Sequence, residues 1–122
     1  MKVLNFGHPF TEAHMEQLRH MLGEEIEVYT IPVNINLEQP IAGQISDLLT
    51  GLPFDLQTEP FVVNLPGLSI AAVALIAELH GRAGHFPAVL RMKQVKDSAA
   101  TTFAIAELVQ LQEVRNTARL RR

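Results

Sequence analysis

Apolar residues along the first half of the chain follow two alternating spacings. Short apolar runs, such as Val3–Phe6 before the turn at Gly7, are typical of buried strands. Apolar residues at every third or fourth position, beginning after the predicted helix cap Thr11 and ending at Gly23, are typical of a helix packed on one side. The pattern predicts strands over residues 3–6, 26–30 and 60–63 and helices over residues 11–22 and 41–52.

The second half continues this alternation and then departs from it. Residues 70–80 predict a helix that is apolar nearly all round, so we expect it to be covered on more than one side. Gly81 and Gly84 are expected to end that helix. The remaining predicted elements are strands over 88–95 and 102–111, joined as a hairpin by the polar turn Lys96-Asp97-Ser98, and a short terminal helix from Gln112.

The order of these elements predicts the fold class. Strands that alternate with helices are the pattern of parallel βαβ units with right-handed crossovers. We therefore expect one α/β domain over residues 1–122, a Rossmann-like three-layer sandwich with a mostly parallel sheet and an antiparallel hairpin near the C-terminus. In the common strand order 2-1-3-4, a crevice lies outside the carboxyl ends of the first and third strands, where such folds bind ligands.

The composition limits which class of protein this chain belongs to and indicates where we expect it in the cell. The chain is 48% hydrophobic and 19% charged, as ordinary globular proteins are. It has no cysteine, which excludes disulfides and thiolate sites, and we expect a cytoplasmic location. Met1–Leu4 leads directly into a predicted strand, so no cleavable signal is expected. Pro66-Gly67 divides the apolar stretch 61–81 into a strand and a helix, so no membrane span is expected.

Charge is distributed unevenly along the chain, although the net charge is only −3. Residues 1–60 hold two basic and nine acidic side chains, whereas residues 61–122 hold eight basic and four acidic. A solvated helix face or a phosphate-binding surface would each explain the arginines at the end, because the planar guanidinium suits phosphate. The acidic total and the few aromatic residues make an RNA-binding accessory the weaker alternative, and no DNA partner is expected. These terminal arginines are Arg115, Arg119, Arg121 and Arg122.

Polar groups gather at the turn after the first predicted strand, where Asn5, Gly7, His8, Pro9 and Thr11 form the first candidate ligand-binding loop. A polar Asn5 inside an apolar strand needs a partner, which a ligand or a neighbouring loop would supply. His8 lies at the predicted crevice mouth, where it would donate to phosphate when protonated or act as a general acid or base. An ordinary surface histidine is the alternative.

The second candidate loop takes the strand over 60–63 directly into a helix. Asn64, Pro66, Gly67, Leu68 and Ser69 form it, and Ser69 is the predicted helix cap. The unpaired amides and the dipole of a helix amino end attract anions, and Gly67 would let a ligand approach the main chain. A plain capped turn, with Asn64 bonded to local backbone, explains the same residues.

A third candidate segment, Gly81–Pro87, carries Arg82 between Gly81 and Gly84, and His85 directly after Gly84. Such a loop enters the amino end of a strand, so we expect it opposite the other two loops, reaching the crevice only from a partner subunit. Helix termination with favourable cations is the alternative. His80 and His85 have no cysteine and no clear carboxylate partner, so no metal is expected.

Common catalytic and cofactor motifs do not occur in the chain. The sequence contains no GxGxxG fingerprint, no P-loop and no GxSxG elbow, which argues against a dinucleotide dehydrogenase, an NTPase and an α/β-hydrolase. Ser69 is therefore not expected to be a nucleophile. We expect no cofactor and no catalytic residue.

Three stretches together carry a resemblance to a known family. They are Val-Leu-Asn-Phe-Gly-His-Pro-Phe-Thr over 3–11, Val-Asn-Leu-Pro-Gly-Leu-Ser over 63–69 and Ala-Glu-Leu-His-Gly-Arg-Ala-Gly-His-Phe-Pro over 77–87. With Leu111–Arg115 and the arginine-rich end, they resemble the small CRISPR-associated family called Csx, number fifteen. The resemblance covers nearly the whole chain.

This resemblance implies a Rossmann-like, CARF-related fold, a homodimer or higher assembly, and recognition of a cyclic oligoadenylate in type III CRISPR antiviral signalling. The four-membered ring suits a two-fold interface. Arg82 or His85 would then contact phosphates, and Asn5 or Asn64 would contact ribose or base edges.

Two functions follow from the resemblance and stay open. A binding protein would sequester the messenger and buffer the signal. A ring nuclease would orient a ribose 2′-hydroxyl for in-line attack without a metal, with His8 and His85 as candidate acid and base. We favour binding, because no acid and base occur at a convincing spacing.

Overall fold

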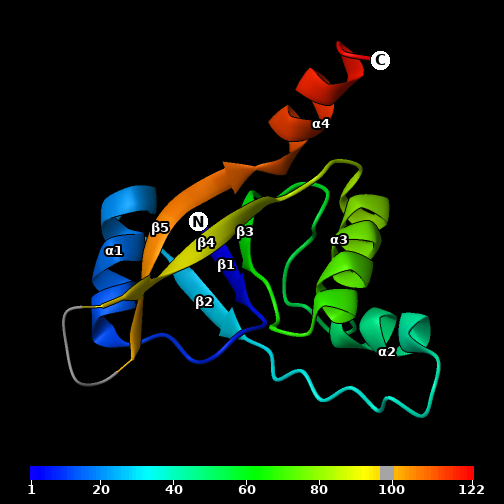
Figure 1. Ribbon diagram of the computed structural model, residues 1–122, viewed down its shortest axis with the longest axis horizontal. Helices are drawn as coiled ribbons and strands as arrows, with labels where there is room; N and C mark the ends of the chain where they lie inside the picture. Colours follow the sequence, from blue (N-terminus) through cyan, green and yellow to red (C-terminus); the bar gives the residue numbers. More distant parts are fainter. Residues whose placement is uncertain (97–100) are drawn as a thin grey trace.

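Five strands form a single sheet in the order β2-β1-β3-β4-β5 in the computed structural model, which describes residues 1–96 and 101–122 (Figure 1). Of the predicted hairpin turn, Asp97 and Ser98 lie outside the described residues. The strands are β1 (Lys2–Asn5), β2 (Glu27–Thr30), β3 (Phe61–Asn64), β4 (Ala88–Val95) and β5 (Thr102–Gln110).

The pairing of the strands confirms the predicted fold class. β1 pairs in parallel with β2 and with β3, and β3 pairs in parallel with β4. β5 pairs antiparallel with β4, and the register shifts between Arg91 and Met92. Because β1 lies between β2 and β3, the chain leaves β1 on one side of the sheet and β3 on the other, which opens a crevice at the carboxyl ends of these two strands.

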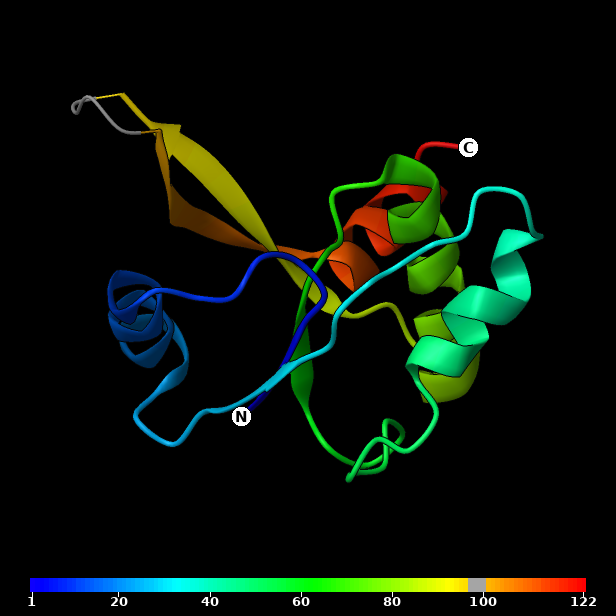
Figure 2. The same ribbon diagram turned by 90° about the horizontal axis from the view of Figure 1, so that it is seen from below.

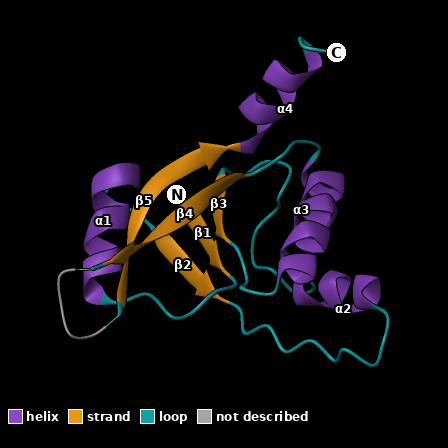
Figure 3. Ribbon diagram, in the orientation of Figure 1, coloured by secondary structure: helices purple, strands orange, loops and turns teal. Residues whose placement is uncertain are grey.

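Helices cover both faces of the sheet and complete the three layers (Figure 3). α1 (Glu12–Leu22) lies on one face, where Leu18 packs with Leu90 and Ile105. α2 (Ile41–Leu48) and α3 (Ser69–Ala83) lie on the other face over a larger core. Successive strand residues point to opposite faces, so each strand contributes to both cores. The larger core includes Leu4, Phe6, Ile45, Leu49, Leu56, Phe61, Val63, Ala71, Leu75, Leu79, Ala83 and Val89.

The predicted ends of α1 are confirmed by their hydrogen bonds. The Thr11 hydroxyl accepts from the His14 amide, as a helix cap does. At the other end, Gly23 has a φ of 102° and its amide donates to the Arg19 carbonyl. Few other residue types tolerate that backbone conformation.

The predictions for α3 were wrong in three respects. The helix passes through Gly81 and ends at Gly84, whose φ of 87° is left-handed. It begins after Leu68 rather than Ser69, and no side chain caps it. Only the stripe Ala71, Leu75, Leu79 and Ala83 is buried, whereas Ile70 and Val73 are 52% and 66% exposed. The helix is therefore open to solvent along the side that carries Ile70 and Val73.

α2 ends earlier than predicted. The helix stops at Leu48, and the chain turns through Gly51 at a φ of 83°. Leu49 and Leu52 nevertheless pack into the core, which explains why their spacing resembles a continued helix.

α4 (Leu111–Arg119) extends away from the rest of the chain (Figure 1). It has no buried residue, and Val114 is 56% exposed. Within the described part of the chain, no helix is long and apolar enough to span a membrane.

Candidate ligand-binding cleft

A cleft of about 1320 Å³ opens at the carboxyl ends of β1 and β3. Figure 2 views the molecule toward this edge, where the chain leaves β1 for α1 and β3 for α3 on opposite sides. Both predicted loops contribute to its lining, so the structure brings them together. The lining residues from these loops are Phe6, Gly7, His8, Pro9, Thr11, Asn64, Leu65, Pro66, Gly67 and Leu68.

Asn5 lies beneath the cleft and organises the first loop. It is fully buried and stands opposite Asn64 in the pairing of β1 with β3. Its Oδ1 accepts from the Gly7 amide at 3.0 Å, and its Nδ2 donates to the His8 carbonyl at 2.9 Å. The partner that a buried asparagine needs is therefore the neighbouring loop.

Asn64 joins the two loops through a hydrogen bond to the Asn5 side chain. Its Nδ2 donates to Asn5 Oδ1 at 2.9 Å. Asn64 is 7% exposed and lines the cleft. This contact replaces the local backbone bond considered as an alternative, because its partner lies on the neighbouring strand.

Gly7 is placed where no larger residue fits without movement. A Cβ at this position would lie 2.7 Å from Asn64 Nδ2 and 3.3 Å from the Leu65 carbonyl oxygen. Gly67 differs, since a Cβ there would meet nothing within 4 Å. The close approach of the two loops therefore depends on Gly7, and Gly67 leaves the opposite wall open.

The amino end of α3 begins next to the cleft lining. Gly67 and Leu68 line it, and α3 begins at the next residue. Ser69 cannot act as the predicted cap, because it is already inside the helix, and it does not line the cleft. Among the described residues, the amides of Ser69, Ile70 and Ala71 have no acceptor. Such amides and the helix dipole favour an anion.

α1 contributes residues that the sequence did not single out. The Thr11 amide donates to His14 Nδ1 at 3.1 Å, so Nε2 carries the ring proton and donates to the Phe103 carbonyl at 2.6 Å. The Gln17 side chain bonds both the amide and the carbonyl of Ile105. These contacts hold the edge strand β5 against α1 and so form one wall.

The remaining lining is mostly apolar and comes from two further segments. One is the hairpin arm, with Met92, Val95 and residues 101–104. The other is the connection after β2, which supplies Val33, Ile35 and Leu37. Its apolar residues alternate with polar ones, which is a detectable signal of a half-buried extended segment.

Few formal charges face the cleft. Among the lining residues that the structure describes, Glu16 is the one acidic side chain and there is no lysine or arginine. His8 is exposed at the rim, and its side chain makes no described hydrogen bond, whereas both ring nitrogens of His14 are occupied. An anion here would be held by main-chain amides and His8.

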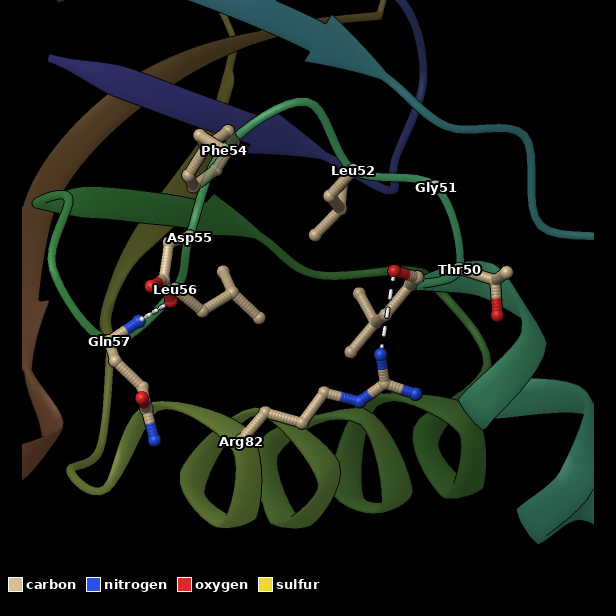
Figure 4. Close-up of a pocket in the computed structure, with 9 residues that line it drawn as sticks. Thr50, Gly51, Leu52, Phe54, Asp55, Leu56, Gln57 and Arg82 are labelled. Carbon is tan, nitrogen blue, oxygen red and sulfur yellow. Dashed lines mark hydrogen bonds between the residues drawn. The ribbon is translucent and has the colours of Figure 1, made fainter.

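Arg82 and His85 lie at the other end of the molecule, as expected from the order of elements. Arg82 Nε donates to Glu78 at 3.0 Å, and its Nη2 donates to the carbonyl and the hydroxyl of Ser46 at 3.0 Å each. The guanidinium also points toward the Leu49 carbonyl, beside a pocket of about 450 Å³ (Figure 4). Arg82 therefore serves as a cap for the last turn of α2.

His85 packs its ring against Phe61 at the amino end of β3, with the ring centroids 6.2 Å apart. It is distant from the cleft because it follows α3 rather than preceding it. Within residues 1–96 and 101–122, no three metal-ligating side chains are grouped closely enough to hold a metal ion.

Comparisons of the chain with protein-family models, with curated proteins and with solved structures find no match.

Proposed function

We propose that the protein binds a cyclic oligoadenylate in the cleft between β1 and β3, at the interface of a homodimer, and thereby sequesters the messenger in the cytoplasm. The observation that carries the proposal is a cleft of about 1320 Å³ that is lined by the loops after β1 and β3, up to Leu68 at the start of α3. Apolar walls suit bases, and the amides suit a phosphodiester. The resemblance to the CRISPR-associated family supplies the identity of the ligand.

Binding is favoured over cleavage because only one histidine in the described cleft lining is free to act as an acid or a base. A nuclease that uses no metal needs an acid and a base near the scissile phosphate. His14 is occupied on both ring nitrogens, and His85 lies at the far end of the sheet. His8 thus remains as the single uncommitted imidazole among the described lining residues.

Titration of the purified full chain with cyclic tetra-adenylate tests the proposal, with isothermal calorimetry as the readout. We expect saturable binding with one ring per two chains. Separation of radiolabelled ring after incubation should return the ring intact. A linear product would replace sequestration by ring cleavage, and absence of any binding would overturn the proposal.

Two variants with the same charge change connect binding to the cleft. Leu68 is 42% exposed at the cleft edge beside the start of α3, whereas Val73 is 66% exposed on the same helix outside the lining. Leu68→Glu should weaken binding about tenfold or more, because its carboxylate competes with phosphate for the same amides. Val73→Glu should leave the affinity unchanged. Equal affinities for both variants would place the ligand elsewhere.

A further inference from the structure

Within the described part of the chain, α4 is held by its first turn. Leu111 packs against the larger core, and the Gln112 side-chain oxygen accepts a hydrogen bond of 2.8 Å from the Phe86 amide. Every residue from 113 to 122 is exposed. A helix of nine residues is marginally stable in water by itself, because most helical stability comes from the packing of an apolar side. The exposed residues of α4 receive little such packing from their own chain.

The exposed part of α4 combines an apolar side with a strong positive charge. Val114 and Ala118 continue the line that Leu111 begins, since residues three and four positions apart lie on one side of a helix. Val114 is 56% exposed, and Leu120, directly after the helix, is 87% exposed. Residues 113–122 carry four arginines and one glutamate, and none of these arginines makes an ion pair among the described residues. A complementary surface would offer carboxylates together with apolar contacts.

The chain itself presents such a surface at the amino ends of β1, β2 and β3. Lys2 lies within it: the hydrogen bond of 2.8 Å to Glu27 raises the pKa of the Lys2 ammonium, and the charge of Glu59 adds to this rise. Met1 contributes an apolar side chain that is 41% exposed, and its amino group bonds the Glu25 carbonyl. We call this surface the acidic edge, after its four exposed carboxylates Glu24, Glu25, Glu27 and Glu59.

A second copy of the chain is the occupant that these two surfaces fit. α4 extends away from the strands of its own chain (Figure 1). Every copy carries both an α4 and an acidic edge of opposite charge, so a two-fold arrangement pairs both surfaces of one copy with those of the other. A nucleic acid would offer phosphates to the arginines but no apolar side chains to Val114 and Leu120.

We infer that α4 docks on the acidic edge of a second copy of the chain, and that the second copy returns its own α4 to the first. Arg115 and Arg119 supply the charge of this contact, and Val114 supplies apolar area. The contact lies at the opposite edge of the sheet from the cleft, because β5 ends beside the start of β4. The inference therefore goes beyond the proposed function and concerns a dimer that forms without a ligand.

Sedimentation velocity of the full chain at several protein concentrations and two salt concentrations tests the inference in the absence of any ring. We expect a reversible dimer whose dissociation constant rises with salt, because exposed charges are screened. A monomer at every concentration would overturn the inference. The proposed function is tested separately by its own titration, so the two can fail independently.

An exchange of charges assigns the contact to α4 and the acidic edge. Arg115→Glu/Arg119→Glu and Glu24→Arg/Glu25→Arg should each weaken self-association about tenfold or more, since attraction is replaced by repulsion. All four positions are exposed, and circular dichroism shows that each variant is folded. An equimolar mixture of the two variants should recover a dimer, because both of its contacts then join opposite charges. A mixture that stays monomeric would overturn the inference.

Two further measurements separate this contact from its alternatives. Lys93→Glu/Lys96→Glu makes the same charge change as the α4 variant at exposed positions on β4 and just after it, and it should associate like the wild type. An equal loss in this control would assign the effect to net charge and overturn the inference. Fluorescence anisotropy with single-stranded oligoadenylate tests the nucleic acid. Binding that depends on Arg115 and Arg119, by a chain that stays monomeric, would make α4 a nucleic-acid contact instead.

Discussion

The side-chain amide of Asn64 donates a hydrogen bond of 2.9 Å to the side-chain carbonyl of Asn5, which lies 59 positions earlier in the chain. The two residues stand opposite one another at the carboxyl ends of β1 and β3. This bond ties together the two loops that leave these strands. The close approach of the two loops therefore depends on this pair of side chains.

Asn5→Ala should lower the free energy of unfolding by about 2–4 kcal/mol. The change removes the acceptor of Gly7 and Asn64 and the donor of His8 at a fully buried position. Urea unfolding followed by circular dichroism measures the loss. Asn34→Ala is the matched control, because Asn34 is exposed and makes no described side-chain bond, and it should stay within about 0.5 kcal/mol of the wild type. Similar values for both variants would contradict the structural role of Asn5.

Gly7→Ala and Gly43→Ala should change stability in opposite directions. At Gly7 the new Cβ would lie 2.7 Å from Asn64 Nδ2, so we expect a loss of about 1–3 kcal/mol. At Gly43, inside α2, a Cβ meets nothing within 4 Å, and alanine should add about 0.5–1 kcal/mol through its better helix propensity. Thermal melting of both variants provides the comparison, and a stable Gly7→Ala would mean that the loops are not in close contact.

Arg82→Met should destabilise the chain by about 1–2 kcal/mol without changing its affinity for cyclic tetra-adenylate. Its guanidinium bonds Ser46, Leu49 and Glu78, all away from the cleft, and its side chain is 35% exposed, which limits the loss. Arg82→Lys should recover little of the lost stability, because an ammonium group cannot make the same set of hydrogen bonds as a planar guanidinium. Weaker ligand binding by a folded Arg82→Met protein would instead place Arg82 in a site completed by a partner subunit.

Glu27→Gln should reduce stability near neutral pH and leave it unchanged in acid. Hydrogen bonds from Lys2, and next from Tyr29, hold the pKa of the Glu27 carboxyl below its ordinary value. A lowered pKa in the folded state stabilises the protein above the ordinary value of about 4.5, and that contribution is lost as the pH falls through the folded-state pKa. Unfolding free energies of the two proteins between pH 7 and about pH 3 measure this difference. A gap that persists at the lowest pH would assign the effect to packing.

The strands and the first helix were predictable because their signals are local, and the order of the sheet is the common one for strands that alternate with helices. Val3–Phe6 and Phe61–Val63 are apolar runs next to turn residues, and Gly23 marks a helix end wherever such a conformation is needed. The meeting of the Gly7 and Gly67 loops followed from the same order, since the carboxyl ends of neighbouring parallel strands lie at one edge.

The wrong predictions concern the start of α3 and the side of that helix that is covered, and the partners of Arg82 were not predictable. Ser69 was taken as a cap from its type alone, but the helix had already begun at that position. The exposed side of α3 depends on where α2 packs, and the partners of Arg82 depend on where α2 ends.

The sequence by itself determined the alternation of strands and helices, the positions of the turns and the presence of polar residues at two strand ends. These features depend on spacing and backbone preference within a few residues. Only the tertiary structure decided that the Asn5 side chain holds its own loop, that Asn64 donates to Asn5 on the neighbouring strand, and that Arg82 caps α2. Which atom of a side-chain amide donates and which accepts depends on its partner. It is therefore determined only when distant segments of the chain come into contact.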